Sequence, residues 1–152
     1  MEFWYFAYGS NLLKDQMMER TGAIGSVEHP PRIARLENHR LVFERLEDTG
    51  PAFANIRSPG DGVLGVVYRC SQAELERLDH FEQGYERQTI EVTDQQDEVL
   101  AAAAYIISPS QSAGFARPEN EYLARIVAGA RQHGLPESYV HQIIAIAGGE
   151  MP

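Results

Sequence analysis

A short apolar run near the start of the chain places the strongest constraint on its fold. Residues 3–8 are almost all apolar and rich in aromatic side chains, the pattern typical of a strand buried on both faces. The run ends at Gly9, and apolar residues recur at helical spacing from Leu13 onward. Ser10 or Asn11 is a good helix N-cap, so the sequence predicts a strand, a tight turn and a helix. Such a junction directs free N–H groups at one point that suits a carboxylate or a phosphate, although a plain strand–helix turn explains the same local pattern.

The length and composition of the chain are typical of one soluble domain. Its 152 residues can bury one hydrophobic core, and no repeat or linker divides them, so we expect a single domain over residues 1–152. No apolar run approaches the roughly 20 residues of a membrane span, and no signal peptide is visible. The single cysteine, Cys70, fits a reducing compartment, so we expect a cytoplasmic protein. The formal net charge of -9 argues against nucleic acid as a partner.

Alternating apolar residues and turn signals predict several strands after the first helix. We expect strands over residues 32–36, 40–44, 52–57, 63–70, 85–93 and 99–107, the last two as a hairpin. Gly65, inside one of these strands, indicates a bulge or a close approach of another backbone. From the residue pattern alone we infer a mixed α/β domain.

Three further helices are predicted. A capping box at residues 71–74 opens the first of them, with Gly84 as its C′ residue and an inward face of Leu75, Leu78 and Phe81. The second covers residues 119–134, and the third begins at Pro136. The acidic balance of the chain makes a DNA-binding helix-turn-helix an unsuitable interpretation of the last two.

Glu82 is a carboxylate in an unexpected position. It follows Leu75 and Leu78 at helical spacing, so it shares the helix face that we expect to be buried. It also lies in the last turn, where the negative end of the helix dipole disfavours an anion. Both effects would raise its pKa toward neutrality, as a general base requires. The alternative is that the helix frays and Glu82 turns into solvent; Asp79, off this face, is interpreted as a structural surface residue.

Several segments together resemble one known family. The turn Tyr8-Gly9-Ser10-Asn11-Leu12 is similar to the signature loop of the γ-glutamylcyclotransferase family, which includes the AIG2-like proteins. Residues 78–87 are similar to its second signature, in which a glutamate closes a helix; here Gln83 separates that glutamate from the following glycine, which leaves the local turn open. Further similarity, in the right order along the chain, lies in Ser58-Pro59-Gly60-Asp61, Gly65-Val66-Val67-Tyr68, Tyr105, Tyr122, His133-Gly134-Leu135-Pro136 and Tyr139.

The resemblance implies both a fold and a reaction. The fold would be α+β, a single domain with a small, mostly antiparallel β-barrel and flanking helices. The reaction would cyclise a γ-glutamyl amino acid or γ-glutamyl amine to 5-oxoproline and release the amine, with Glu82 as the catalytic general acid/base and no metal or organic cofactor. The turn amides would hold either the α-carboxylate or the oxyanion. The substrate-binding residues would be Tyr8, Gly9, Ser10, Asn11, Leu12 and Tyr105.

Alternatives remain open at this point. The same chemistry could act on a specialised γ-glutamyl-protected intermediate, or the chain could be a non-catalytic module that binds a γ-glutamyl or other carboxylate ligand. Glu82 counts against such a module, because an anion binder gains nothing from a carboxylate there. Tyr8 and Tyr105 could be core aromatics of their strands. Cys70 is interpreted as inert packing, and the five histidines lack metal-ligand spacing. The leaving amine and the existence of a homodimer are not readable from the sequence.

Overall fold

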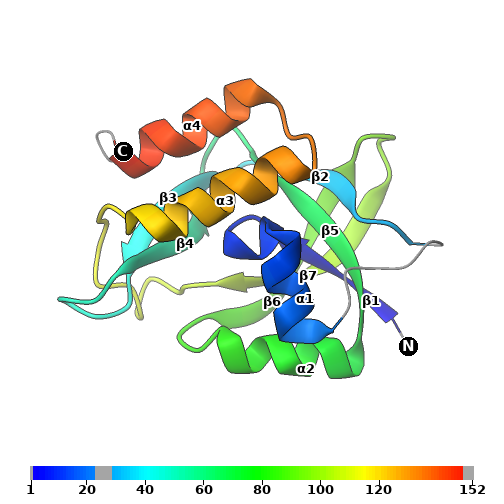
Figure 1. The fold of residues 1–152 in the computed structure, drawn as a ribbon, viewed down its shortest axis with the longest axis horizontal. Helices are drawn as coiled ribbons and strands as arrows, with labels where there is room; N and C mark the ends of the chain where they lie inside the picture. Colours follow the sequence, from blue (N-terminus) through cyan, green and yellow to red (C-terminus); the bar gives the residue numbers. More distant parts are fainter. Residues whose placement is uncertain (1, 23–28, 149–152) are drawn as a thin grey trace.

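The first strand closes a barrel. In the computed structural model, which describes residues 2–22 and 29–148, β1 (Glu2–Ala7) lies in a barrel of five strands ordered β1-β5-β2-β6-β7 (Figure 1). β1 pairs antiparallel with β5 and parallel with β7, and the other neighbours in the barrel are antiparallel. The last three residues of β1 are all buried, although alternate side chains point to opposite faces of the barrel wall, so this half of the strand is buried on both faces. The expected α+β barrel is therefore confirmed.

The remaining strands agree closely with the sequence pattern. The barrel also contains β2 (Arg32–Leu36), β5 (Val63–Ser71), β6 (Glu86–Asp94) and β7 (Val99–Ile106), and a separate two-stranded sheet contains β3 (Arg40–Arg45) and β4 (Ala52–Arg57). Gly65 marks a close backbone approach, as predicted, because a Cβ atom there would lie 2.3 Å from the carbonyl oxygen of Ala7. The absence of a side chain at Gly65 thus lets β5 approach the end of β1.

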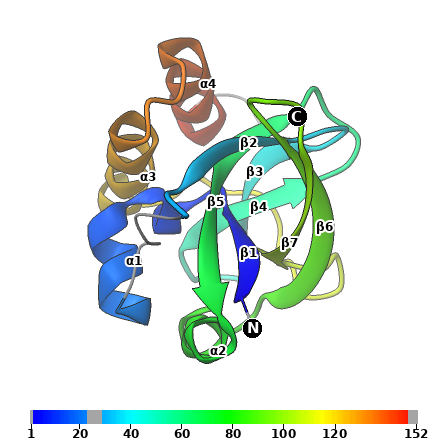
Figure 2. The same cartoon turned by 90° about the vertical axis from the view of Figure 1, so that its right-hand side faces the viewer.

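The helices lie on one side and at one end of the barrel, and β6 on the opposite side is largely exposed (Figure 2). They are α1 (Lys14–Thr21), α2 (Gln72–Phe81), α3 (Asn120–Gln132) and α4 (Glu137–Gly148), with a 3₁₀ turn, η1 (Ser10–Leu12), before α1. Figures 1 and 2 show α1 between α2 and the α3–α4 pair. α2 begins at the predicted capping box, in which Ser71 and Glu74 bond to each other's backbone N–H groups. No helix in the described ranges is long and apolar enough to cross a membrane.

Three local expectations were wrong. Neither Ser10 nor Asn11 caps an α-helix, because they form η1 and the N-cap of α1 is Leu13. Phe81 does not face inward but is 54% exposed. Gly84 takes the expected positive φ of 92°, yet it lies one residue beyond the C′ position because Glu82 is the C-cap. These errors share a cause. The chain changes direction within one or two residues both after β1 and at the end of α2, and a periodic sequence pattern does not resolve such short turns.

A close helix contact holds the η1 turn against the barrel. A Cβ atom at Gly129 of α3 would lie 2.4 Å from the backbone of Leu12, so only glycine permits this approach. Behind the turn, the hydroxyl of buried Tyr68 donates to the carbonyl oxygen of Asn11 at 3.0 Å, and Nε2 of His133 lies 2.9 Å from the carbonyl oxygen of Leu12. The turn that follows β1 is thus fixed from two sides.

Candidate active site

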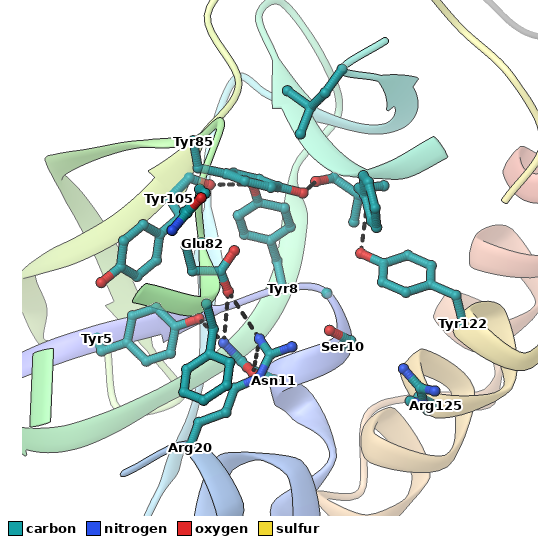
Figure 3. A pocket seen from close by; sticks show the side chains of 16 residues that line it. Tyr5, Tyr8, Ser10, Asn11, Arg20, Glu82, Tyr85, Tyr105, Tyr122 and Arg125 are labelled. Carbon is teal, nitrogen blue, oxygen red and sulfur yellow. Dashed lines mark hydrogen bonds and ion pairs between the residues drawn. The ribbon is translucent and has the colours of Figure 1, made fainter. Parts of the chain in front are cut away.

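A cavity of about 160 Å³ opens where the end of β1, the end of α2 and the first half of α3 meet. Figure 3 shows its tyrosines and charged side chains, which come from separate elements. Of the site residues expected from the sequence, Leu12 is not part of the wall, because its side chain is fully buried in the core. The wall consists of Tyr5, Tyr8, Gly9, Ser10, Asn11, Arg20, Leu46, Phe53, Ala54, Phe81, Glu82, Gln83, Tyr85, Tyr105, Tyr122 and Arg125.

The carboxylate of Glu82 points into this cavity (Figure 3). Its side chain is only 14% exposed, so the predicted burial is confirmed and the alternative of a solvated glutamate is wrong. Burial raises the pKa of Glu82 above its ordinary value, while Arg20 and a hydrogen bond from Asn11 lower it in part. A carboxyl group whose pKa is raised in this way is a stronger base than an ordinary glutamate, as a general acid/base requires.

The side-chain amide of Asn11 connects the η1 turn to Glu82. Its Nδ2 atom donates to Oε1 of Glu82 at 3.0 Å and to the hydroxyl of Tyr5 at 2.8 Å. Its Oδ1 atom accepts from Nε2 of Gln16 at 2.9 Å and from Nη1 of Arg20 at 3.2 Å. All four hydrogen-bonding positions of this amide are thus occupied, which fixes its orientation toward the carboxylate. Asn11 therefore positions Glu82 instead of capping a helix.

Arg20 supplies a positive charge beside the carboxylate. Its Nη1 atom lies 3.4 Å from Oε1 of Glu82, and its guanidinium group lies 4.9 Å from the centre of the Phe81 ring. This stacking contact accounts for the exposed position of Phe81 at the rim of the cavity. Arg20 therefore keeps the pKa of Glu82 from rising as far as burial alone would raise it.

The turn offers backbone donors, although not at the end of an α-helix as we expected. The amides of Leu12 and Leu13 close η1 by bonding to the carbonyl oxygens of Gly9 and Ser10. Within the described parts of the chain, the N–H groups of Gly9, Ser10 and Asn11 have no hydrogen-bond acceptor. Since all three residues line the cavity, these amides are available to an oxygen atom of a ligand.

Tyr8 and Tyr105 line the cavity, but their hydroxyl groups bond to the protein. The hydroxyl of Tyr8 donates to the carbonyl oxygen of Tyr105 at 2.5 Å. The hydroxyl of Tyr105 donates to Oδ1 of Asp79 at 2.6 Å, and Oδ2 of Asp79 pairs with Arg87 at 3.4 Å. These contacts support the interpretation of Asp79 as a structural residue. They also favour the alternative interpretation of Tyr8 and Tyr105 as packing aromatics with satisfied hydroxyls.

Two other tyrosines close the cavity on the side of β4. The hydroxyl of Tyr85 donates to the carbonyl oxygen of Ala54 at 2.5 Å, and the N–H of Ala54 donates to the hydroxyl of Tyr122 at 3.0 Å. Burial raises the pKa of both tyrosines, that of Tyr122 to about 12. They therefore remain neutral hydrogen-bonding groups at physiological pH and cover the open edge of β4.

Sequence reasoning missed Arg20, Tyr85 and Arg125 as parts of this site. A signal existed for Arg20, because it follows Gln16 by four residues and thus shares one helix face with it. No local signal identifies Arg125, since its proximity to the turn depends on how α3 packs. Within residues 2–22 and 29–148, no group of three or more His, Cys, Asp or Glu side chains is placed to hold a metal ion.

Comparisons with known proteins agree on one family. The profile of the AIG2-like family matches residues 62–143. The gamma-glutamylcyclotransferase of Mus musculus is 30% identical over 97% of this chain and 80% of its own length. The Homo sapiens gamma-glutamylcyclotransferase is 30% identical over 95% of this chain and 78% of its own length. A solved structure of a gamma-glutamyl cyclotransferase superposes with a TM-score of 0.86 at 28% identity, covering 99% of this chain and 91% of that one.

Proposed function

The chain belongs to the γ-glutamylcyclotransferase family of AIG2-like proteins, and we propose that it converts a γ-glutamyl amino acid or γ-glutamyl amine to 5-oxoproline and a free amine. In this proposal Glu82 is the general acid/base, and the backbone N–H groups of Gly9, Ser10 and Asn11 bind the substrate. The observation that carries it is the mostly buried carboxylate of Glu82 beside free backbone amides in one cavity.

The reaction is intramolecular. The α-nitrogen of the substrate attacks its own γ-carbonyl carbon, a ring C–N bond forms, and the C–N bond to the leaving amine breaks. The two protons lost by the α-ammonium group end on the leaving amine, so no water, oxidant or co-reactant is consumed. Closing a ring within one bound molecule is worth an effective molarity of about 10⁵–10⁸ M, provided that the chain is held in a folded conformation.

Glu82 has the properties that the proton transfers require. An ordinary glutamate would be too weak a base for an ammonium group, whereas burial raises the pKa of Glu82 and improves the match. The same carboxyl group can then deliver the proton to the departing nitrogen. Asn11 and Arg20 both contact Oε1, which leaves Oε2 without a protein partner among the described residues and available for proton exchange.

The turn supplies the electrostatic part of the mechanism. The N–H groups of Gly9, Ser10 and Asn11 are available to hold either the α-carboxylate or the oxyanion that develops on the γ-carbonyl. An acidic protein that binds an anionic substrate needs such local donors, because its net charge of -9 repels anions at long range.

The direct test is to incubate the protein with a panel of γ-glutamyl amino acids and γ-glutamyl amines and to measure 5-oxoproline. We expect 5-oxoproline from at least one compound with the parent protein and none above background with Glu82→Gln. Binding of a γ-glutamyl compound without 5-oxoproline would instead favour a non-catalytic binding module.

A further inference from the structure

Gln16 carries a buried amide group behind the turn, and the proposed reaction gives it no direct part. It lies near the start of α1 and is only 8% exposed. Its Nε2 atom is 2.7 Å from Oγ of Ser10 and 2.9 Å from Oδ1 of Asn11. One amide group thus contacts two neighbouring residues of the cavity wall, although Gln16 does not line the cavity itself.

The neighbouring helices hold α1, and with it Gln16, at both ends (Figure 1). Oε1 of Gln132 on α3 accepts from the N–H group of Lys14 at 3.1 Å. Nη1 of Arg77 on α2 donates to the carbonyl oxygen of Thr21 at 2.6 Å. The position of Gln16 therefore follows from helix packing and does not depend on a bound ligand.

The direction of the bond between Gln16 and Asn11 follows from the chemistry of their partners. A guanidinium group can only donate, so the side-chain atom of Asn11 that contacts Arg20 is the oxygen. An ionised carboxylate can only accept, so the atom of Asn11 that contacts Glu82 is the nitrogen (Figure 3). Gln16 contacts the oxygen of Asn11, and it must therefore donate through Nε2.

The second N–H of the same Nε2 atom is directed at Ser10. Because Oγ of Ser10 accepts this bond, the hydroxyl hydrogen of Ser10 has to donate in another direction. Ser10 lines the cavity beside Tyr122, where burial raises the pKa of Tyr122 to about 12 and a hydrogen bond from Ser10 opposes that rise. Gln16 thus directs the donors of both Ser10 and Asn11 toward the cavity.

The amide of Asn11 has one competing orientation. Turned end for end, its oxygen would face the carboxylate of Glu82 and its nitrogen would face Arg20, so that acceptors and donors would each oppose their own kind. Two donors to Oδ1 prevent this rotation, Gln16 at 2.9 Å and Arg20 at 3.2 Å. Gln16 is the closer and more deeply buried of the two, since the Arg20 side chain is 22% exposed and also contacts Glu82. A hydrogen bond away from water constrains its partner more strongly.

We propose that Gln16 is a positioning residue of this site, and that its two N–H groups fix the Ser10 hydroxyl and the Asn11 amide so that Asn11 donates to the reacting carboxylate. This role depends on the proposed function. Gln16 acts on the reaction through Asn11, because the ionised form of Glu82 gains from the Asn11 donor and the protonated form does not.

The test is Gln16→Met, which keeps the length of the side chain and removes both donors without changing the net charge. We expect kcat/KM for a γ-glutamyl substrate to fall about twofold to tenfold, the range for one neutral hydrogen bond. Burial raises the pKa of Glu82 and the bond from Asn11 opposes that rise, so the acidic limb of the kcat/KM profile should move to higher pH. Partial unfolding would instead lower kcat/KM without moving the limb. The control is Gln72→Met, which removes one exposed Nε2 contact on α2 and should change neither quantity.

The limb reports Glu82 because the other titratable groups that face it keep one charge state. Arg20 stays positive at every pH of the assay. Burial raises the pKa of the tyrosines of the cavity wall, so they stay neutral; these are Tyr5, Tyr8, Tyr85, Tyr105 and Tyr122.

A double-variant cycle tests whether Gln16 acts through Asn11. Asn11→Ala alone should move the limb to higher pH, and Gln16→Met added to it should move the limb no further. Gln16→Glu keeps the shape of the side chain but presents an acceptor, so it should lower kcat/KM more than Gln16→Met does at a pH where both carboxyl groups are ionised.

The outcomes separate this role from the proposed function. An unchanged limb in Gln16→Met, an equal further shift in the double variant, or full kcat/KM in Gln16→Glu would overturn the positioning role and leave the cyclisation intact. No 5-oxoproline from any γ-glutamyl compound with the parent protein would overturn the proposed function and the positioning role together.

Discussion

The Nδ2 atom of Asn11 lies 3.0 Å from Oε1 of Glu82, which joins the turn after the first strand to the end of α2 across 71 positions of sequence. The contact joins the two segments that each resemble a signature of the γ-glutamylcyclotransferase family. The turn does not merely offer amides to a ligand, because its asparagine also orients the carboxylate. The site is thus a single hydrogen-bonded unit, and substitutions within it should have coupled effects.

Glu82→Gln should lower kcat by at least about 100-fold, because a primary amide cannot accept the proton of the ammonium group. Substrate binding should change little, since the carbonyl oxygen of the introduced side-chain amide can still accept from Asn11. Steady-state kinetics with a γ-glutamyl substrate measures both. The matched control is Asp79→Asn, which keeps an acceptor for Tyr105 and should cost far less activity. A greater loss in Asp79→Asn would mean that the wrong carboxylate has been assigned.

The stability of the same variant should depend on pH in a defined direction. Burial raises the folded-state pKa of Glu82 above its unfolded value, so the folded state holds a proton that the unfolded state releases. The contribution of Glu82 to stability is therefore full below the unfolded pKa, about 4.3, and is lost as pH rises through the folded pKa. Urea unfolding should show Glu82→Gln gaining stability relative to the parent as the pH rises from about 4 toward the folded-state pKa of Glu82. A gain that shrinks with rising pH would contradict the assignment.

Arg20→Met should move the acidic limb of the pH profile of kcat/KM to higher pH. Arg20 lowers the pKa of Glu82, so its removal lets that pKa rise and delays formation of the basic carboxylate. Activity should therefore fall most at low pH and recover partly as pH increases. The control is Lys14→Met, which removes one positive charge from the same helix at a position outside the cavity wall. It should not shift the acidic limb of the kcat/KM profile. An equal shift in both variants would indicate a general effect of net charge.

Gly9→Ala should impair activity through the position of the turn. Gly9 has a negative φ of -119°, so backbone strain is not the reason. A Cβ atom there would lie 3.1 Å from Cβ of Ala54, which would push the turn away from β4. We expect a rise in KM with fold retained, measured by kinetics and circular dichroism. The control is Gly148→Ala, because a Cβ atom at Gly148 would have no neighbouring atom within 4 Å. Unchanged kcat and KM in Gly9→Ala would show that the turn is not part of the site.

Tyr105→Phe should affect stability more than catalysis. The lost hydroxyl donates to Asp79, so the expected cost is about 1 kcal/mol of unfolding free energy. Because this hydroxyl bonds to the protein, kcat/KM should stay within about threefold of the parent value. Urea unfolding and steady-state kinetics measure the two effects. A tenfold or larger fall in kcat/KM with stability unchanged would restore Tyr105 as a substrate ligand.

The sequence was informative where structure depends on neighbouring residues. Six strands after the first lie within one residue of their predicted bounds, and the capping box at Ser71 starts α2 as expected. Glu82 stands out in the sequence because a carboxylate on an apolar helix face contradicts the local pattern. The errors at Ser10 and Phe81 arose where a turn of one or two residues decides the direction of a side chain.

By itself, the sequence determined the order of strands and helices and the carboxylate at the end of α2, since both follow from side-chain periodicity and capping. Only the tertiary structure decided that the Asn11 amide faces Glu82, that Arg20 lies beside it and that Arg125 lines the same cavity. The physical reason is distance along the chain. These groups come from the turn after β1 and from α1, α2 and α3, and packing of the helices against the closed barrel is what brings them together.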